Sequence, residues 1–111
     1  MVSKDLLKGT LKTIVLKLLS EEGKMYGYEI TRKVEEMTKG KLHLTWGALY
    51  PSLHKLEADG HISSEEVHIG KRVRKYYTLT PSGIEVMKEK LEEFFEYVSM
   101  ITNILDPDPA F

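Results

Sequence analysis

The chain has 111 residues, enough for one domain with a modest hydrophobic core, and 30% of its residues are charged. It contains no cysteine, which excludes disulfide bonds, thiolate metal ligands and a cysteine nucleophile. The formal net charge is −1, but residues 1–80 carry 14 Lys and Arg against 10 Asp and Glu, whereas residues 81–111 carry 2 Lys against 7 Asp and Glu. This asymmetry predicts a basic working end and an acidic end with a different role.

Two helices are predicted before the middle of the chain. Over residues 5–20 apolar side chains recur every three or four positions, as in an amphipathic helix, and a shorter pattern of the same kind spans residues 26–38. Gly23 and Gly40 follow these segments, as expected where a helix end needs a residue that tolerates positive φ. Residues 42–44 alternate between apolar and polar side chains, which predicts a brief extended piece.

A third helix is predicted to begin at Thr45, a good N-cap, and to end at Asp59-Gly60. At about 100° per residue its leucines cluster on the side that must face the core: Leu49, Leu53 and Leu56. The opposite side is small and polar: Gly47, Ala48, Tyr50, Pro51, His54, Lys55 and Ala58. Such a side suits close approach to DNA, and free N–H groups at the helix start can bind phosphate. An ordinary solvated surface would show the same pattern.

Two residues of this helix leave alternatives open. Pro51 lies inside it and removes a backbone hydrogen bond, so the regular helix is expected either to start closer to Ala48 or to bend. Trp46 lies at the edge of the buried sector. It either packs under the turn or contacts DNA or a ligand.

The hydrophobic period then changes and predicts a β-hairpin followed by a long helix. Residues 62–69 and 75–80 are expected to be strands, joined by a short connection that begins with glycine. The candidate buried positions in these strands are Val67, Ile69, Tyr77 and Leu79. Pro81-Ser82 opens the final helix, which is expected to run to about Leu105, and residues 106–111 are expected to be a disordered tail.

This order of elements is the layout of a winged helix-turn-helix. We expect a mainly α fold with a small β-hairpin (α+β), a DNA-binding domain in residues 1–80 and a dimerisation helix in residues 81–105. The hairpin concentrates cations where a turn normally needs one or two polar groups: Lys71, Arg72, Arg74 and Lys75. We interpret them as phosphate contacts that make binding salt-dependent, although lysine also protects edge strands from aggregation.

Three segments resemble the signature segments of the PadR family of transcriptional regulators: YGYEI (26–30), GALYPSLHKLEADGHI (47–62) and GKRVRKYYTLTPSG (70–83). The resemblance covers residues 5–105 and is to the small members of the family, which have a single C-terminal helix. Members of this kind are dimers and mostly repressors, and many release DNA when a small aromatic or lipophilic compound binds. The resemblance implies these properties for the present chain. It also implies a recognition helix at Thr45 to Asp59, a wing at Gly70 to Lys75, and Tyr50 near the DNA backbone. The residues expected at the DNA interface are Tyr26, Thr45, Gly47, Ala48, Tyr50, His54, Lys55, Lys71, Arg72, Arg74 and Lys75.

The last helix carries an unbroken heptad stripe of apolar residues: Ile84, Met87, Leu91, Phe94, Val98, Ile101 and Leu105. We expect this stripe to form a homodimer interface with Leu7 and Leu11 of the first helix as a second wall, unless it folds back on its own domain. A twofold dimer would read a pseudo-palindromic site in double-stranded DNA. Phe94, Phe95 and Val98 are candidates for an effector site, where plain core packing is the alternative.

No catalytic or metal site is predicted. The histidines show no metal-ligand grouping, and no phosphate-binding glycine loop, nucleophile elbow or paired carboxylates are present. We therefore expect a non-enzyme without metal or cofactor. Lysines interrupt the N-terminal apolar run, so neither a signal peptide nor a membrane span is expected, and the protein is expected to be cytoplasmic. The alternative class is a dimeric winged-helix protein-interaction module that does not bind DNA.

Overall fold

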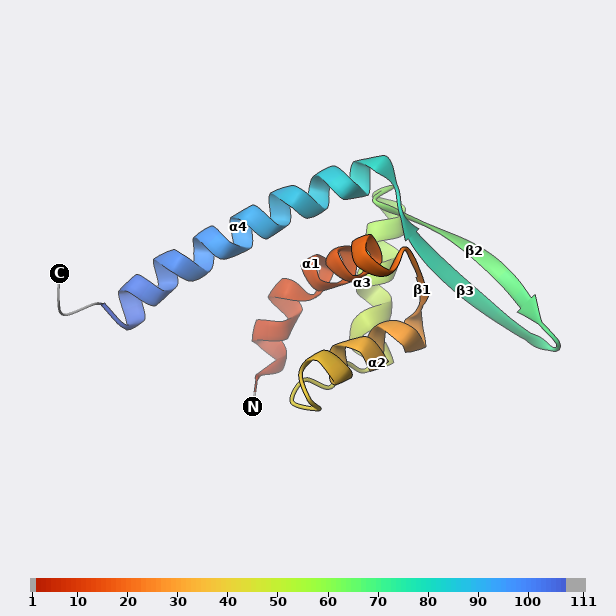
Figure 1. Cartoon of the computed structure of the whole chain (residues 1–111), viewed down its shortest axis with the longest axis horizontal. Helices are drawn as coiled ribbons and strands as arrows, with labels where there is room; N and C mark the ends of the chain where they lie inside the picture. The colour runs from red at the N-terminus through yellow and green to blue at the C-terminus, as the bar shows by residue number, and fades with distance from the viewer. Residues whose placement is uncertain (1, 108–111) are drawn as a thin grey trace.

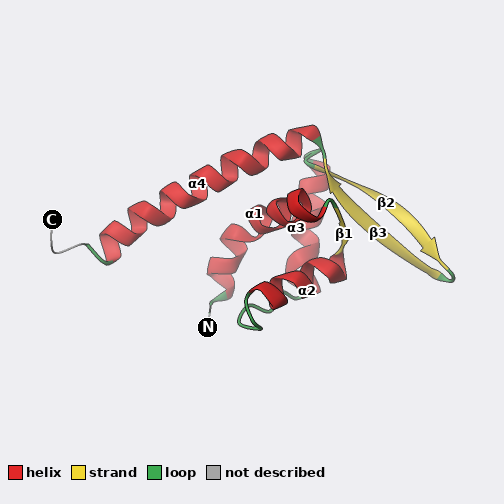
Figure 2. Cartoon of the chain, in the orientation of Figure 1, coloured by secondary structure: helices red, strands yellow, loops and turns green. Residues whose placement is uncertain are grey.

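The computed structural model describes residues 2–107 and contains there four α-helices and a three-stranded antiparallel sheet (Figures 1 and 2). In chain order the elements are α1 (Lys4–Glu22), β1 (Lys24–Tyr26), α2 (Gly27–Met37), α3 (Trp46–Ala58), β2 (Ile62–Ile69), β3 (Arg72–Leu79) and α4 (Pro81–Leu105). The strands lie in the order β1-β3-β2. The α+β winged-helix fold class is confirmed. From residue 108 onward the expected tail lies outside the described residues.

Side-chain caps explain where α3 and α4 begin. The Thr45 hydroxyl accepts a hydrogen bond from the backbone N–H of Ala48 at 3.2 Å. Thr80 does the same for Gly83 at 3.1 Å, and Pro81 occupies the first helical turn, where its missing N–H is not needed. Each cap satisfies an N–H group that has no partner within its helix. Both helices therefore start at the positions that the sequence predicts.

α3 runs without interruption through its proline. It begins at Trp46, directly after the predicted N-cap Thr45, which excludes the alternative of a regular helix that starts closer to Ala48. Pro51 lacks the N–H that would bond to the carbonyl of Gly47. Because Gly47 and Pro51 both lie on the exposed side of the helix, water can satisfy that carbonyl and the helix continues to Ala58.

The extended piece predicted for residues 42–44 is not a strand, and a short strand is found elsewhere. β1 pairs with β3, with Lys24 opposite Thr78. A strand of three residues is too short to show a period of two, which is why the sequence does not indicate it. Within the described residues, segment 42–44 has no strand beside it and forms a loop with Leu44 buried.

The wing, formed by β2 and β3, begins its second strand earlier than predicted. β3 starts at Arg72 instead of residue 75, so only Gly70 and Lys71 form the turn. Gly70 has a φ of 62°, and a positive φ at the first of two central residues is the signature of a type II′ hairpin turn. Such a tight turn lets strand pairing start at once, with Ile69 opposite Arg72.

The wing leaves the helical body, and its outer half lacks a cover (Figure 1). Near its base Tyr77 is buried and Leu79 is half-buried, as expected. Val67 is half-buried further out. Ile69 is 45% exposed, so the prediction that it is buried is wrong. The hairpin is covered only near its base, because it extends beyond the helices that could cover its tip.

The core lies where the first three helices meet the base of the sheet. Its most completely buried large side chains are Leu16, Leu19, Ile30, Leu49, Leu53, Leu56, Ile62 and Val15. The first half of α4 belongs to this core as well, because Met87 is part of it and Leu91 packs against it. The core holds α3 with its leucines inward and its opposite side in solvent.

A tight polar junction joins α4 to the turn between α3 and β2. The hydroxyls of Thr80 and Ser82 both donate to the carbonyl of Gly60, at 2.7 and 3.0 Å. The backbone N–H of Thr80 donates to the carbonyl of His61 at 3.2 Å. Gly83 lies so close that a Cβ on it would be 1.9 Å from that carbonyl oxygen. The junction therefore fixes the direction of α4 relative to the end of α3.

We expect Gly83→Ala to destabilise the protein by about 1–3 kcal/mol, because the added methyl group must push the junction apart. Gly9→Ala is the matched control. A Cβ on Gly9, within α1, would meet nothing within 4 Å, and alanine favours a helix over glycine by up to about 1 kcal/mol. Urea unfolding followed by circular dichroism measures both variants. Equal stability of the two would contradict the close approach at Gly83.

Candidate nucleic-acid interface

α3 presents the surface that its sequence predicts. Leu49, Leu53 and Leu56 are at most 1% exposed and face the core. The interface residues predicted in this segment are all exposed: Thr45, Gly47, Ala48, Tyr50, His54 and Lys55. The Lys55 ammonium lies 3.1 Å from a carboxylate oxygen of Asp59, one turn further on. The N-terminal half of α3 therefore offers small and aromatic side chains to a partner, and no charged ones.

Three exposed rings form a row along α3, which we name the aromatic row: Trp46, Tyr50 and His54. The ring centroids of Trp46 and Tyr50 are 5.3 Å apart, and those of Tyr50 and His54 are 6.1 Å apart. Trp46 is 52% exposed, yet a Cβ on Gly27 of α2 would be only 2.2 Å from its ring. Trp46 thus packs against α2 with one part of its ring and leaves the rest open. Trp46 is not among the residues that the sequence predicts at the DNA interface.

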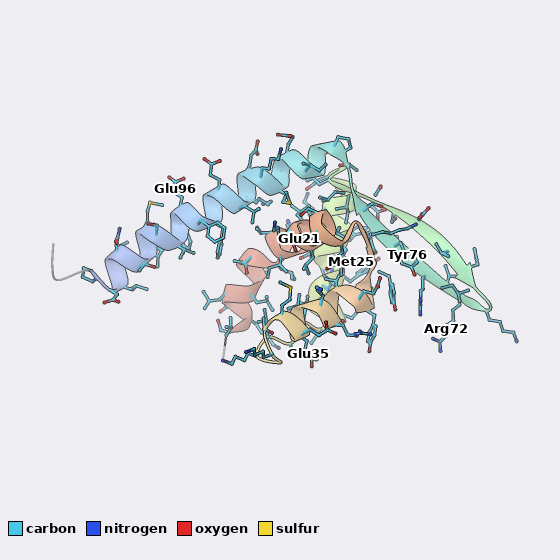
Figure 3. The ribbon with its side chains drawn as sticks, viewed as in Figure 1. Glu21, Met25, Glu35, Arg72, Tyr76 and Glu96 are labelled. Atoms are coloured by element: carbon cyan, nitrogen blue, oxygen red, sulfur yellow. The ribbon has the colours of Figure 1, made fainter. Side chains whose placement is uncertain are left out.

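Lys71 and Arg72 form the tip of the wing and are both exposed. Figure 3 shows Arg72 projecting from the hairpin near its far end, away from the helices. None of the ion pairs among the described residues involves either side chain. Both cations are therefore free to contact phosphate.

Arg74 packs on an aromatic cluster instead of standing alone. Its guanidinium carbon lies 4.4 Å from the ring centroid of Tyr26, which is a cation–π contact. Tyr26 also meets Tyr76 edge to face at 5.4 Å and stacks near Tyr28 at 6.4 Å. Figure 3 shows Tyr76 on the inner part of the wing. Tyr26, predicted to contact DNA, is half-buried here and supports the guanidinium of Arg74.

Lys75 is tied to α3 on the other face of β3. Its ammonium lies 3.3 Å from the carboxylate of Glu57, which also accepts a hydrogen bond from the hydroxyl of Ser64 on β2. The Ser64 hydrogen bond, supported by Lys75 and partly opposed by burial, lowers the pKa of Glu57. Partial burial works to lower the pKa of Lys75, but the hydrogen bond to Glu57 and nearby negative charge outweigh it, and the pKa is raised. We name Glu57, Ser64 and Lys75 the wing clamp; because of it the wing presents fewer unpaired cations than the sequence indicates.

We expect Glu57→Gln to lower the free energy of unfolding at neutral pH by up to about 1 kcal/mol, because the clamp is only partly shielded from solvent. The folded-state pKa of Glu57 lies below the unfolded value of 4.5, so its carboxylate stabilises the protein above pH 4.5 and this contribution is lost as the pH falls through the folded pKa. The stability difference between the native protein and the variant should therefore shrink below pH 4.5. Urea unfolding at pH values on both sides of that point measures it.

Glu36→Gln is the control for this experiment. The Glu36 carboxylate is 60% exposed and pairs with Arg32 at 3.5 Å on the surface of α2, so its loss should change stability little. A difference between the native protein and Glu57→Gln that grows on acidification would contradict the wing clamp.

The residues predicted at the dimer interface fall into three groups. Leu11 and Met87 are only 3% and 9% exposed within one chain, so their side chains offer almost no surface to a partner. Four are half-buried: Leu7, Leu91, Phe94 and Ile101. Three are exposed: Ile84, Val98 and Leu105. Met87 and Leu91 thus pack on their own domain, whereas the exposed side chains of Ile84, Val98 and Leu105 leave apolar surface at the start of α4 and along its second half.

Two adjoining grooves lie beside α4. An open groove of about 950 Å³ runs between α1 and the second half of α4, with Phe94 and Val98 among its lining residues. A smaller groove of about 270 Å³ is lined by Phe94 and Phe95. These two rings meet edge to face at 5.4 Å. The structure therefore distributes the candidate effector residues over two neighbouring grooves that share Phe94.

The fold and the site define the class of the protein. Three helices, the third of them exposed beside a two-stranded wing with a cationic tip, form a winged helix-turn-helix DNA-binding domain. In residues 2–107 no helix is long and apolar enough to cross a membrane, and no three metal-binding side chains gather in one place.

The chain belongs to the PadR-like family of transcriptional regulators, whose family model matches residues 15–89. Its structure is similar to that of a transcriptional regulator from Clostridium thermocellum, with 34% identity and a TM-score of 0.84 over 93% of this chain and 97% of that one. A PadR family transcriptional regulator from Eggerthella lenta is also similar, with 28% identity and a TM-score of 0.81 over 94% of this chain and 88% of that one. The Mycobacterium tuberculosis transcriptional regulator Rv3488 is 38% identical over 55 residues, which are 50% of this chain and 51% of that protein. The chain is thus a DNA-binding regulator of transcription and not an enzyme.

Proposed function

We propose that the protein is a homodimeric repressor that binds a pseudo-palindromic site in double-stranded DNA and is released by a small aromatic or lipophilic effector. The observation that carries this proposal is the uncovered apolar face on the second half of α4, where Val98 and Leu105 are 40% and 77% exposed. Figure 1 shows this half of the helix projecting beyond the domain. An exposed apolar surface on a long helix indicates an interaction site, and regulators of this family typically act as dimers.

A second copy of the chain is the simplest partner for this face. The stripe on α4 keeps the heptad spacing that two helices need to pack along their length. α4 and the wing leave the body in opposite directions (Figure 1), so two copies joined along α4 keep both wings free for DNA. Residues 1–80 then act as the DNA-binding domain and the second half of 81–105 as the dimer interface. The half-sites would lie about 34 Å, one turn of DNA, or a multiple of it apart.

An effector fits the groove between α1 and α4. Its volume of about 950 Å³ lies in the range of small-molecule sites. Phe94, which lines both grooves, offers a ring face or edge for an aromatic compound. Because the groove borders the proposed interface at Val98, a compound bound there changes how the two α4 helices pack. A repressor that acts on the chromosome works in the cytoplasm, and we place the protein there.

Selection of duplexes from a random-sequence pool tests the proposed operator. We expect a twofold-symmetric consensus, two protected half-sites in a footprint, and less transcription in vitro from a promoter that carries the selected site. An unsymmetrical single half-site, or increased transcription, would contradict a dimeric repressor. Failure to retain any duplex at low salt would contradict DNA binding itself.

The aromatic, lipophilic dye anilinonaphthalene sulfonate tests the effector site. We expect its fluorescence to rise when it binds the native protein, and the selected duplex to dissociate as the dye is added. Phe94→Ala should weaken both effects. Val73→Ala, which removes an apolar side chain 53% exposed on the wing, should change neither. If the dye binds but the DNA complex stays intact, the proposed release of DNA by an effector is wrong.

A further inference from the structure

The side of α3 that faces solvent lacks the side chains that read most bases. Between Thr45 and Asp59 there is no Arg, Asn or Gln, the residues that make paired hydrogen bonds to guanine and adenine. The helix has one lysine, Lys55, whose ammonium lies 3.1 Å from Asp59 near the helix end. Its one glutamate, Glu57, is held in the wing clamp by Lys75. The hydroxyl of Thr45 bonds to any base edge and discriminates little.

The N-terminal half of α3 presents mainly apolar groups, and the polar residues His54 and Lys55 follow further along the helix. Trp46 and Tyr50 are 52% and 44% exposed, and the exposed small side chains of Ala48 and Pro51 lie beside them, Ala48 between the two along the chain and Pro51 directly after Tyr50. The rings of the aromatic row touch one another, and Trp46 also rests against Gly27, so the row is held in place before DNA binds. Ring positions fixed in this way limit the entropy that is lost on binding.

One base-edge group in the major groove matches such a surface. The C5 methyl group of thymine is the apolar feature of that groove, and apolar side chains contact it directly. The cations of the wing tip, Lys71 and Arg72, bind phosphates and carry no sequence information. Affinity and base preference therefore have separate sources in this protein.

We propose that the aromatic row, with Ala48 beside it, reads the methyl groups of thymines in each half-site of the operator. This inference rests on the proposed operator binding. It requires the selected half-sites to share thymines at the positions that face α3. It also requires binding to depend on the methyl groups themselves and not only on the identity of the base pairs.

Replacing thymine by uracil in the selected duplex removes only these methyl groups. The two duplexes have the same phosphates and the same hydrogen-bonding groups, so fluorescence anisotropy can compare them directly. Loss of one buried methyl contact should weaken binding about fourfold, and a site with two half-sites should lose about tenfold or more. Uracil placed only outside the half-sites should have no effect.

Variants of the aromatic row connect this loss to the protein. Tyr50→Phe keeps the ring and should preserve the preference for thymine over uracil, whereas Tyr50→Ala should reduce it about fourfold. Trp46→Ala should reduce it in the same way. Because both side chains are exposed, these variants should fold, which circular dichroism checks. Arg72→Ala should weaken both duplexes alike and leave the preference unchanged.

Three outcomes are distinct. Equal binding of the thymine and uracil duplexes by the native protein would overturn the inference while leaving operator binding intact. Selected half-sites without shared thymines would also overturn it. Failure of the native protein to bind any duplex would instead overturn the proposed function on which the inference rests.

Discussion

Replacing Val98 and Leu105 together by glutamate should turn the proposed dimer into a monomer. Both side chains are exposed on the uncovered half of α4, so the substitutions leave the core of the chain intact. In the dimer they would place two carboxylates from each chain in an apolar interface, where an unpaired charge is very unfavourable. We expect the dissociation constant of the dimer to rise about a thousandfold or more, which corresponds to roughly 4 kcal/mol. Sedimentation velocity over a range of protein concentrations measures it.

Asn103→Glu is the matched control for the dimer experiment. It adds one carboxylate per chain, against two in the double variant, to the same part of α4 at an exposed position on the side away from the stripe, and it should leave the dimer intact. Leu91→Glu, which the sequence alone suggests as a monomer-forming change, is a poorer test. Leu91 packs against the core, so its loss would also destabilise the single chain. A Val98, Leu105 double variant that still sediments as a dimer would show that the subunits meet elsewhere.

The same double variant should bind the operator at least about a hundredfold more weakly than the native protein. Two linked domains bind two half-sites with a high effective concentration at the second one, and a monomer loses this advantage. Binding to a duplex with a single half-site should change little, because α3 and the wing are untouched. Comparing the two duplexes separates loss of dimerisation from damage to the DNA-binding surface.

Arg72→Ala should weaken operator binding about tenfold at low salt and make it less sensitive to salt. Each phosphate contact contributes about −0.9 to the slope of log affinity against log salt, so a dimer without Arg72 should lose about 1.8 from the magnitude of that slope. Anisotropy titrations at several salt concentrations measure both quantities. We expect this effect because Arg72 is exposed at the wing tip and forms no ion pair within residues 2–107.

Lys88→Ala removes the same charge at a different place and serves as the control for Arg72. Lys88 is 65% exposed on α4, far along the chain from the wing, and its loss should leave the salt slope unchanged. Lys75→Ala should reduce the slope less than Arg72→Ala, because Glu57 already pairs with Lys75. An unchanged slope in Arg72→Ala would show that the wing tip does not contact phosphate.

Patterns confined to one element were predicted well from the sequence. The bounds of α4 agree with the structure because a long heptad pattern repeats its signal several times, and the predicted bounds of β2 agree as well. The N-cap at Thr45 and the buried leucines of α3 also agree, since both depend on local spacing alone. β1 was missed because a strand of three residues becomes a strand only through its pairing with β3.

Contacts between distant elements were not predictable in the same way. Nothing in the sequence shows that Glu57 meets Lys75, because that contact depends on how the wing is placed beside α3. The aromatic support of Arg74 by Tyr26 likewise requires β1 to lie next to β3. The heptad stripe on α4 is continuous in sequence, yet Met87 and Leu91 within it pack on their own domain.

The junction at Gly83 has a consequence for how repression could be relieved. Two hydroxyls bonded to the carbonyl of Gly60, and a glycine with no room for a side chain, prevent α4 from swinging on its own domain. In the proposed dimer each subunit would then move as one body, and the adjustable angle would lie between the subunits. If the proposed repression is relieved in this way, it needs neither unfolding nor a change within α3. A slight rotation of one subunit against the other puts its wing out of phase with the next turn of the double helix.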